Sequence, residues 1–340
     1  MPFFSSDPDA IRMLRKDPDI FLVRIPSPAV VSGATNCFVV MDGGEQLIVD
    51  IGPRTREGLR IWRRVFEELG LSRERLVVYL THLHDDHAGG IHDLHLGDTP
   101  VLVPRLNHED ALYRHNPQNY QRFRERWVKE DFPIGDRRFL RFTGASYYTY
   151  LPPKMDVRYL DPGAVVPVGG HAFEVVDTSG HVPGHSSLFQ AGTGVLFNGD
   201  HLLFDVTPVF EPCAYHLDVP GLYVQNLRKI QALDVSLHCH AHGALDTDTS
   251  YIERADKIIS RVNGRIERSY ATIERKPGLT GAEVVRRMGW RTKGLMWEEL
   301  GTGLRENILQ SGLSILDALL ARGRVYRELD SLGRYHYYTC

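Results

Sequence analysis

Short apolar runs alternate with polar turns through the first third of the chain. This pattern is typical of β-strands with buried faces. One longer segment, 55–69, instead carries apolar side chains at helical spacing and stops before Gly70, so we expect a helix there. The expected strands occupy residues 21–26, 36–42, 46–52, 75–82 and 101–104.

The alternation resumes after residue 160 and predicts a second block of strands with two helices. Residues 105–160, which separate the two blocks, are rich in aromatic and charged side chains. We expect them to form a partly helical insertion outside the core framework. The strands of the second block are expected at residues 164–168, 171–178, 187–192, 194–200 and 235–243. The helices are expected at residues 222–233 and 249–274.

The last 65 residues follow a pattern of their own after a Lys-Pro-Gly break at 276–278. Thr280, with Glu283 three residues later, forms a capping box that begins a helix. A second helix is expected at 303–322, and two strands then flank a turn at 331–334. Two helices followed by a two-stranded hairpin are the pattern of a winged-helix domain. The expected domains are residues 1–275 and residues 276–340.

The composition excludes several classes of protein. The 340 residues are 42% hydrophobic with a formal net charge of -3, which argues against collagen-like, disordered and dedicated nucleic-acid-binding chains. The N-terminus lacks a basic start followed by an apolar run, and no stretch approaches the ~20 apolar residues of a membrane helix. We therefore expect a cytoplasmic protein without a membrane partner. Four cysteines are too few for a disulfide scaffold, but sixteen histidines are an unusual number.

The first concentration of histidines is Thr-His-Leu-His-Asp-Asp-His at 81–87, where an expected buried strand ends. Neutral imidazole and carboxylate groups suit a divalent ion such as Zn²⁺. Because residues i and i+2 of an extended segment point the same way, His82 and His84 can converge on one ion. After the chain turns, Asp86 and His87 can face a neighbouring ion. The simpler alternative, a solvated histidine-rich loop, is disfavoured because similar clusters recur.

Three more clusters of candidate ligands lie at the ends of expected strands, at residues 178–186, 196–200 and 238–243. In order and spacing, the four clusters resemble the metal-ligand motifs of the metallo-β-lactamase superfamily of di-metal hydrolases, over about residues 20–250. The loops are most similar to the glyoxalase II-like branch. The tail is similar to the winged-helix appendage of a β-lactamase-like subgroup that contains an endoribonuclease and acyl-carrier thioesterases. The resemblance implies an α/β fold, a four-layer αββα sandwich of two mixed sheets with helices outside, here with an aromatic-rich insertion and a C-terminal winged-helix domain.

The resemblance also implies roles for individual residues. The implied ligands of the first metal are His82, His84 and His181, those of the second metal are Asp86, His87 and His242, and Asp200 bridges both ions. His240 is an alternative to His242, because it lies two residues away on the same strand face, and His242 is preferred because it directly precedes Gly243. Asp50 is expected to orient a ligand, and His185 to support the loop or line the pocket.

The expected chemistry is hydrolysis by a di-metal centre. Zinc is the first choice for the two divalent ions, with iron or manganese as alternatives. A hydroxide shared by the ions would attack the substrate, and Asp86 and Asp200 are the catalytic candidates. No Gly-x-Ser-x-Gly string, which would indicate a serine nucleophile, occurs in the chain.

The substrate is less constrained than the metal site. We expect a small-molecule acyl substrate, a thioester or a lactone, and the alternative is RNA or another phosphodiester. The tail holds ten basic against seven acidic side chains, but its second expected helix has only Arg305 and Arg322 as basic residues, which disfavours duplex binding. The aromatic insertion can serve as a substrate lid, or its aromatic residues can pack it onto the sandwich or onto the partner in a homodimer. A non-catalytic binding protein is disfavoured because every ligand position is filled.

Overall fold

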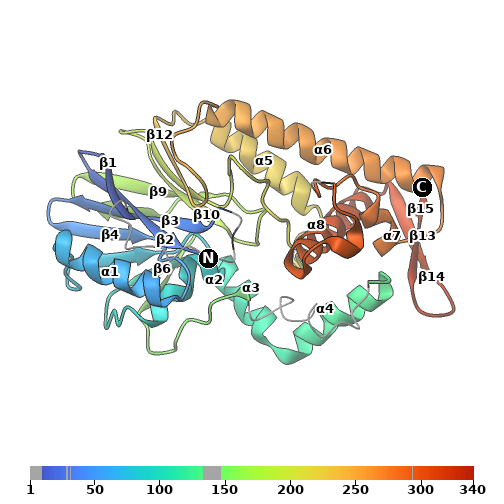
Figure 1. Ribbon diagram of the computed structural model, residues 1–340, viewed down its shortest axis with the longest axis horizontal. Helices are drawn as coiled ribbons and strands as arrows, with labels where there is room; N and C mark the ends of the chain where they lie inside the picture. Colours follow the sequence, from blue (N-terminus) through green and yellow to red (C-terminus); the bar gives the residue numbers. More distant parts are fainter. Residues whose placement is uncertain (1–9, 28–29, 31, 133–146, 293) are drawn as a thin grey trace.

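The computed structural model describes residues 10–27, 30, 32–132, 147–292 and 294–340. Two mixed β-sheets lie face to face, and helices cover their outer sides (Figure 1). Apolar side chains from both sheets form one buried cluster between them, in which the rings of Phe38 and Phe197 lie 5.2 Å apart. The two mixed sheets flanked by helices agree with the expected architecture.

The first sheet has seven strands that follow one another in chain order. The first four pair antiparallel, and the last three add in parallel. The antiparallel strands are β1 (Ile11–Arg15), β2 (Asp19–Pro26), β3 (Ala34–Asp42) and β4 (Glu45–Val49). The parallel strands are β5 (Leu76–Tyr79), β6 (Val101–Pro104) and β7 (Val157–Leu160). All five strands predicted in the first block are present, whereas β1 was not predicted.

The second sheet has five strands in the order β12-β11-β10-β9-β8. Its strands are β8 (Val165–Val168), β9 (His171–Asp177), β10 (Ser186–Gln190), β11 (Val195–Gly199) and β12 (Leu237–His240). Only β12 runs parallel to its neighbour, so the carboxyl ends of β11 and β12 meet at one edge of the sheet. Asp200 and the 238–243 cluster therefore come together, as expected for residues at the ends of neighbouring strands.

The helices cover opposite faces of the sandwich. Helix α1 (Arg56–Glu68) is capped by Thr55 and packs on the first sheet, where the indole of Trp62 donates a hydrogen bond to the carbonyl of Ile51. Helices α5 (Val219–Gln231) and α6 (Tyr251–Arg275) cover the second sheet. These helices agree with the periodicity of the sequence, and apolar burial on one face explains why they form.

The predicted insertion is narrower than residues 105–160. Helices α3 (Arg105–His115) and α4 (Pro117–Lys129) confirm that it is partly helical. Its expected C-terminal end was wrong, because residues 157–160 form β7, which pairs with β6 as part of the core sheet. This four-residue strand has a half-exposed pattern without a continuous apolar run, so its sequence resembled a loop. Residues 133–146 of the insertion lie outside the described residues.

The C-terminal region combines two α-helices with a small three-stranded sheet. Its main elements are α7 (Gly281–Arg286), the 3-10 helix η5 (Trp297–Glu299), α8 (Thr302–Ala321), β13 (Leu279–Thr280), β14 (Val325–Leu329) and β15 (Tyr335–Thr339). The predicted capping box of Thr280 and Glu283 begins α7. Side chains of α5, α6 and α8 share one buried apolar cluster, so this region packs directly on the main body. None of the described helices combines the length and apolar character needed to cross a bilayer.

Candidate metal centre

The segment after β5 brings the first candidate ligands to the edge of the sheet. It remains extended through His82 and His84, and the short helix α2 (Asp85–Ala88) then carries Asp86 and His87. His82, His84 and His87 are almost completely buried. A solvated loop would leave these rings in water, so the structure disagrees with that alternative.

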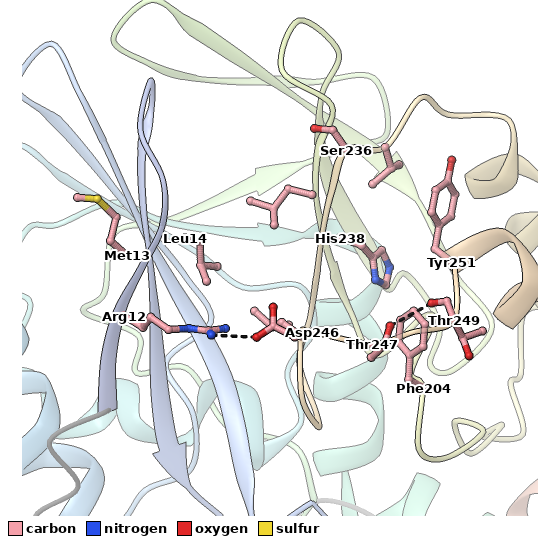
Figure 2. A pocket seen from close by; sticks show the side chains of 13 residues that line it. Arg12, Met13, Leu14, Phe204, Ser236, His238, Asp246, Thr247, Thr249 and Tyr251 are labelled. Atoms are coloured by element: carbon pink, nitrogen blue, oxygen red, sulfur yellow. Dashed lines mark hydrogen bonds and ion pairs between the residues drawn. The ribbon is translucent and has the colours of Figure 1, made fainter.

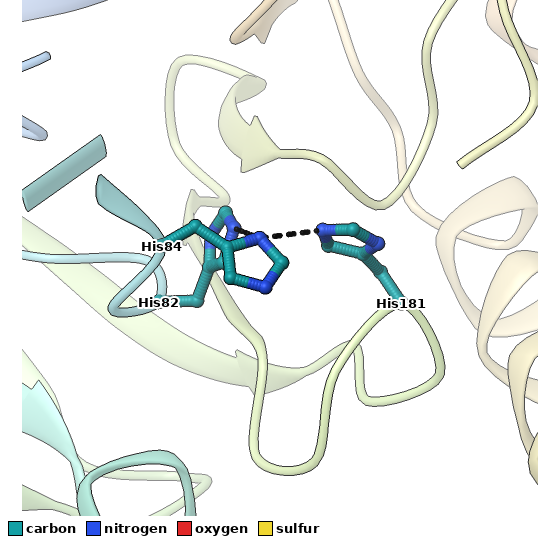
Figure 3. A group of neighbouring side chains, drawn as sticks. All are labelled: His82, His84 and His181. Carbon is teal, nitrogen blue, oxygen red and sulfur yellow. Dashed lines mark hydrogen bonds between the residues drawn. The ribbon is translucent and has the colours of Figure 1, made fainter. Parts of the chain in front are cut away.

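His82, His84 and His181 form the first group, shown in Figure 3. Nδ1 of His84 lies 3.0 Å from Nε2 of His82 and 3.2 Å from Nε2 of His181. On its other side, the His181 ring donates from Nδ1 to the carbonyl of Val209 at 2.7 Å. Three imidazole nitrogens therefore face one another within reach of a single ion, and at least one ring is held from behind.

Asp86, His87 and His242 form the second group. The Asp86 Oδ2 lies 3.3 Å from Nε2 of His242 and 3.9 Å from Nε2 of His87. Asp200 lies between the two groups. Its Oδ1 is 3.4 Å from Nε2 of His87 and 3.2 Å from Nε2 of His242, and its Oδ2 is 3.7 Å from Nε2 of His181. One carboxylate therefore faces nitrogens of both groups.

Several of these atoms are buried without a hydrogen-bond partner among the described residues: Nε2 of His87, Nε2 of His242 and Oδ1 of Asp200. Burying a polar atom without a hydrogen-bond partner lowers the stability of the fold, and folded proteins contain few such atoms. A group of them in one place therefore needs an explanation. Imidazole nitrogens and carboxylate oxygens are ligands of Zn²⁺ and similar divalent ions. The donor set and the unpartnered atoms therefore fit a metal site.

The two groups differ electrostatically. Burial and the neighbouring ring of His84 lower the pKa of His181 to about 4, which leaves its imidazole neutral. Burial opposes a charge on His242 too, but Asp200 and Asp86 outweigh it and raise the pKa of His242 to about 10. The same carboxylates, with Asp50, raise the pKa of His87 well above its usual value. In the second group, protons on the two histidines therefore balance the negative charge of the carboxylates. A bound cation can displace these protons.

Asp50 and His185 support the site from behind. Asp50 accepts hydrogen bonds from the backbone N–H and hydroxyl of Thr81, both at 2.8 Å, and from Nδ1 of His87 at 2.9 Å. His185 donates from Nδ1 to Thr178, so its Nε2 accepts the backbone N–H of Asp200 at 3.1 Å. Asp50 was predicted to orient a ligand, and His185 to support the loop or line the pocket; both contact segments that carry candidate ligands.

The structure separates His240 from His242. The His240 ring packs edge-on against Phe204, with centroids 5.0 Å apart, and it belongs to neither group of candidate ligands. His242 lies two residues beyond the end of β12, where Nε2 reaches both Asp86 and Asp200. The chain turns after β12 ends at His240, so the two histidines no longer share a strand face.

Sequence reasoning missed a buried group behind His84. Glu211 places Oε1 3.2 Å from Nε2 of His84, while its Oε2 accepts a hydrogen bond from the Tyr148 hydroxyl and pairs with Arg114 at 3.0 Å. Burial opposes ionisation, but Arg114 and His84 hold the pKa of Glu211 well below its usual value. The ring of Tyr147 also packs edge-on against that of His84. The available signal was one acidic residue within the apolar, proline-containing stretch 208–213.

A separate cavity of about 350 Å³ lies where β1 approaches β12 (Figure 2). Arg12 and Asp246 form an ion pair at its wall, and His238 and Tyr251 also line it. None of the candidate metal ligands lines this cavity.

Comparison with known proteins identifies the family. The sequence model of the metallo-beta-lactamase superfamily matches residues 31–242. An atrochrysone carboxyl ACP thioesterase of Paecilomyces divaricatus is 27% identical over 298 residues, which cover 85% of this chain and 74% of that one. Another, from Aspergillus novofumigatus (strain IBT 16806), is 25% identical over 331 residues, which cover 96% of this chain and 80% of that one.

Two solved structures share the fold over nearly the whole chain. A beta-lactamase domain protein from Burkholderia ambifaria has a TM-score of 0.80 at 22% identity, covering 100% of this chain and 97% of that chain. A metallo-beta-lactamase family protein from Thermus thermophilus has a TM-score of 0.72 at 21% identity, covering 94% and 98%. The family match spans more than half of the chain, and buried His and Asp clusters are typical of the metal sites of this family. The chain therefore belongs to the metallo-β-lactamase superfamily and is a metal-dependent hydrolase of that fold.

Proposed function

We propose that this hydrolase works with two divalent ions, zinc in the first place and iron or manganese as alternatives, and cleaves the thioester of a small acyl group. The observation that carries the proposal is the position of Asp200 between two groups of ligand atoms, with its Oδ1 unpartnered among the described residues. A carboxylate in this position would help to hold both ions. A lactone remains the second acyl substrate.

The residues divide into three sets in this proposal. His82, His84 and His181 would hold one ion, Asp86, His87 and His242 would hold the other, and Asp200 would touch both. When bound, the ions supply the Lewis acidity that activates water and stabilises negative charge on the carbonyl oxygen. Asp200 and Asp86 accept hydrogen bonds and so orient the attacking water. Asp50 and Glu211 hold the rings of His87 and His84 in the orientation that binding requires.

The names of two related proteins favour a thioester over a lactone as the substrate. Two of them, each covered over more than two thirds of its length, are ACP thioesterases by name. The packing of Tyr147 against His84 supports a further part of the proposal, that the insertion contributes aromatic surface to the substrate site. We expect the acyl group to contact this surface.

We also propose that residues 276–340 form a winged-helix domain that serves packing, not duplex binding. Helices α7 and α8 precede the β14–β15 hairpin, which is the order that this domain type requires. Most apolar side chains of α8 are buried in the cluster shared with α5 and α6, so they are not available for a nucleic acid. A homodimer remains a prediction from the sequence.

Metal analysis and a substrate panel test the proposal. Purified protein should contain about two metal ions per chain by mass spectrometry. It should hydrolyse acyl-thioesters faster than lactones, bis-(p-nitrophenyl) phosphate or single-stranded RNA. Cleavage of RNA without cleavage of any ester would refute the acyl assignment. A protein that holds one ion per chain after incubation with Zn²⁺, Mn²⁺ or Fe²⁺ would refute the two-ion centre.

A further inference from the structure

Helix α6 carries a row of arginines that the metal centre does not use. They lie at positions i, i+7, i+11 and i+14, which is the spacing of one helix face. Arg291, in the segment after α7, acts electrostatically on several of them and therefore lies beside this face. We call these five residues the arginine face: Arg254, Arg261, Arg265, Arg268 and Arg291.

The arginine face has no carboxylate partner in the part of the chain that the structure describes. Among the described residues, none of its five members forms an ion pair, although thirteen other arginines do. Asp205 acts on Arg254 only from a distance. Glu267, which lies on the same helix, pairs with Arg324 instead. The face therefore presents positive charge that the described part of the chain does not neutralise.

One member of the face is buried with an unused donor. The Arg265 residue is only 8% exposed, its guanidinium stacks 4.0 Å above the ring of Trp290, and its Nε has no partner among the described residues. Burial, together with the charges of Arg268, Arg261 and Arg291, lowers the pKa of Arg265 to about 10. Several guanidinium groups held close together without an anion repel one another, which is unfavourable. A bound anion would replace this repulsion by attraction.

Hydrogen bonds connect the arginine face to the loop that follows Asp200. Arg254 donates to the carbonyls of Leu203 and Val206, both at 2.6 Å, and Arg261 donates to the hydroxyl of Thr207 at 2.7 Å. Two residues further along this loop, Val209 accepts the hydrogen bond of the His181 ring. Through Arg254 and Arg261 the face is therefore attached to the loop that follows Asp200, and this loop also contacts the ring of His181.

We propose that the arginine face binds the phosphate groups of the carrier arm on which a thioester substrate is presented. The assignment rests on the proposed thioesterase function and extends it to a substrate class, phosphorylated thioesters of the coenzyme A or phosphopantetheine type. Guanidinium groups suit phosphate because their planar donors pair with two of its oxygens at once. The exposed Arg268 and Arg291 would meet the phosphate first, and the buried Arg265 would strengthen the local positive field.

Binding measurements test the site without turnover. Coenzyme A is the probe, and pantetheine, which lacks phosphate, is its control, each titrated into the metal-loaded protein by calorimetry. The double variant Arg268→Gln/Arg291→Gln should weaken coenzyme A binding about tenfold or more and leave pantetheine binding unchanged, because charge-assisted hydrogen bonds are lost. The matched control is Arg56→Gln/Arg63→Gln, which removes from α1 two exposed arginines that form no ion pair with any residue the structure describes. It should bind coenzyme A like the wild type.

Each outcome decides the proposal. Equal binding of coenzyme A and pantetheine by the wild type, or an equal loss in both double variants, would overturn it. So would binding of single-stranded RNA, but not of coenzyme A, that depends on Arg268 and Arg291. Coenzyme A binding that requires these arginines supports the site even if acetyl-coenzyme A is not hydrolysed, and in that case the thioesterase function fails instead. If both hold, the double variant should lower kcat/KM for acetyl-coenzyme A relative to acetyl-pantetheine by about the same factor as binding.

Discussion

Two buried polar clusters, the metal centre and the surroundings of Glu130, differ in whether their polar atoms have hydrogen-bond partners. At the metal centre, Asp200 and His242 keep atoms without hydrogen-bond partners among the described residues. Glu130, at the end of α4, is completely buried, but its Oε1 accepts from Arg327 at 2.8 Å and its Oε2 accepts from the Tyr337 hydroxyl at 2.9 Å. The difference teaches that a buried acid whose partners are all protein groups holds the fold together, whereas Asp200, whose unpartnered oxygen faces unpartnered histidine nitrogens, marks the place of a ligand.

The position of each cluster agrees with this distinction. Glu130 joins α4 to β14 and β15, and an ion pair between Arg126 and Asp317 joins the same helix to α8. These contacts connect the insertion with the C-terminal region. The metal centre instead lies at the ends of strands from both sheets, where unpaired polar groups can face a ligand. Four changes test the comparison, and we describe them from the largest expected effect to the smallest.

Replacing Asp200 by Ala should have the largest effect. It removes the carboxylate that faces both groups of ligands, so hydrolysis should fall by roughly a thousandfold or more, because several kcal/mol of stabilisation are lost. Metal per chain, measured by mass spectrometry, should fall with it. The control His240→Asn changes a buried histidine outside the ligand groups and should keep the metal. If Asp200→Ala retains the full metal content, the unpartnered atoms do not mark a metal site.

Replacing Glu211 by Gln should weaken metal binding by about 10- to 100-fold, the usual effect of losing the group that orients a ligand. The amide cannot offer a charged acceptor to the ring of His84. Competition with a chelator measures the affinity. Glu109→Gln, an exposed change on α3, is the control. An unaltered affinity in Glu211→Gln would mean that Glu211 belongs with Glu130, as a purely structural acid.

Replacing Tyr337 by Phe should lower the free energy of unfolding by about 1–3 kcal/mol, because Glu130 loses a hydrogen-bond donor while staying buried. Urea denaturation measures the change. Metal content and hydrolysis should not alter, since no candidate ligand is touched. Tyr326→Phe, an exposed change in β14 of the same sheet, should have almost no effect on stability. A loss of metal in Tyr337→Phe would show that the two clusters are coupled, contrary to the comparison.

Glu306 is an intermediate case that sharpens the comparison. This residue of α8 is 2% exposed, and both of its oxygens lack partners among the described residues. Burial and the charge of Glu211 raise the pKa of Glu306 from 4.5 to about 8. Between these values the folded state keeps a proton that the unfolded state has lost, so this group lowers stability as the pH rises from about 4.5 to about 8.

Replacing Glu306 by Leu should therefore stabilise the protein by about 1 kcal/mol, because an unpartnered buried carboxyl is removed. The gain should be larger at pH ~8 than at pH ~5, the direction that linkage requires. Denaturation at both values measures it, and Glu328→Leu, an exposed change in β14, is the control. A variant that is less stable than the wild type at both pH values would show that Glu306 has a stabilising partner.

Much of the fold could be predicted from the sequence because its signals are local. The apolar alternation of residues 36–42 and the helical spacing of 55–69 report burial of one face of a strand or helix. β1 and β7 escaped prediction because edge strands are short and half-exposed, so their apolar pattern is weak. The capping box at Thr280 was readable because both of its partners lie within one helical turn.

The features of the candidate site likewise divide into those that local sequence patterns predict and those that depend on tertiary contacts. The sequence by itself determined the family, the order of the four ligand clusters and the residues within them, because each cluster follows a strand whose pattern is local. Only the tertiary structure decided that Glu211 lies behind His84, that His242 and not His240 reaches Asp86, and that the arginine face forms no ion pair among the described residues. These facts depend on which strand ends and helix faces meet, and no local pattern encodes a contact between residues that are more than a hundred positions apart.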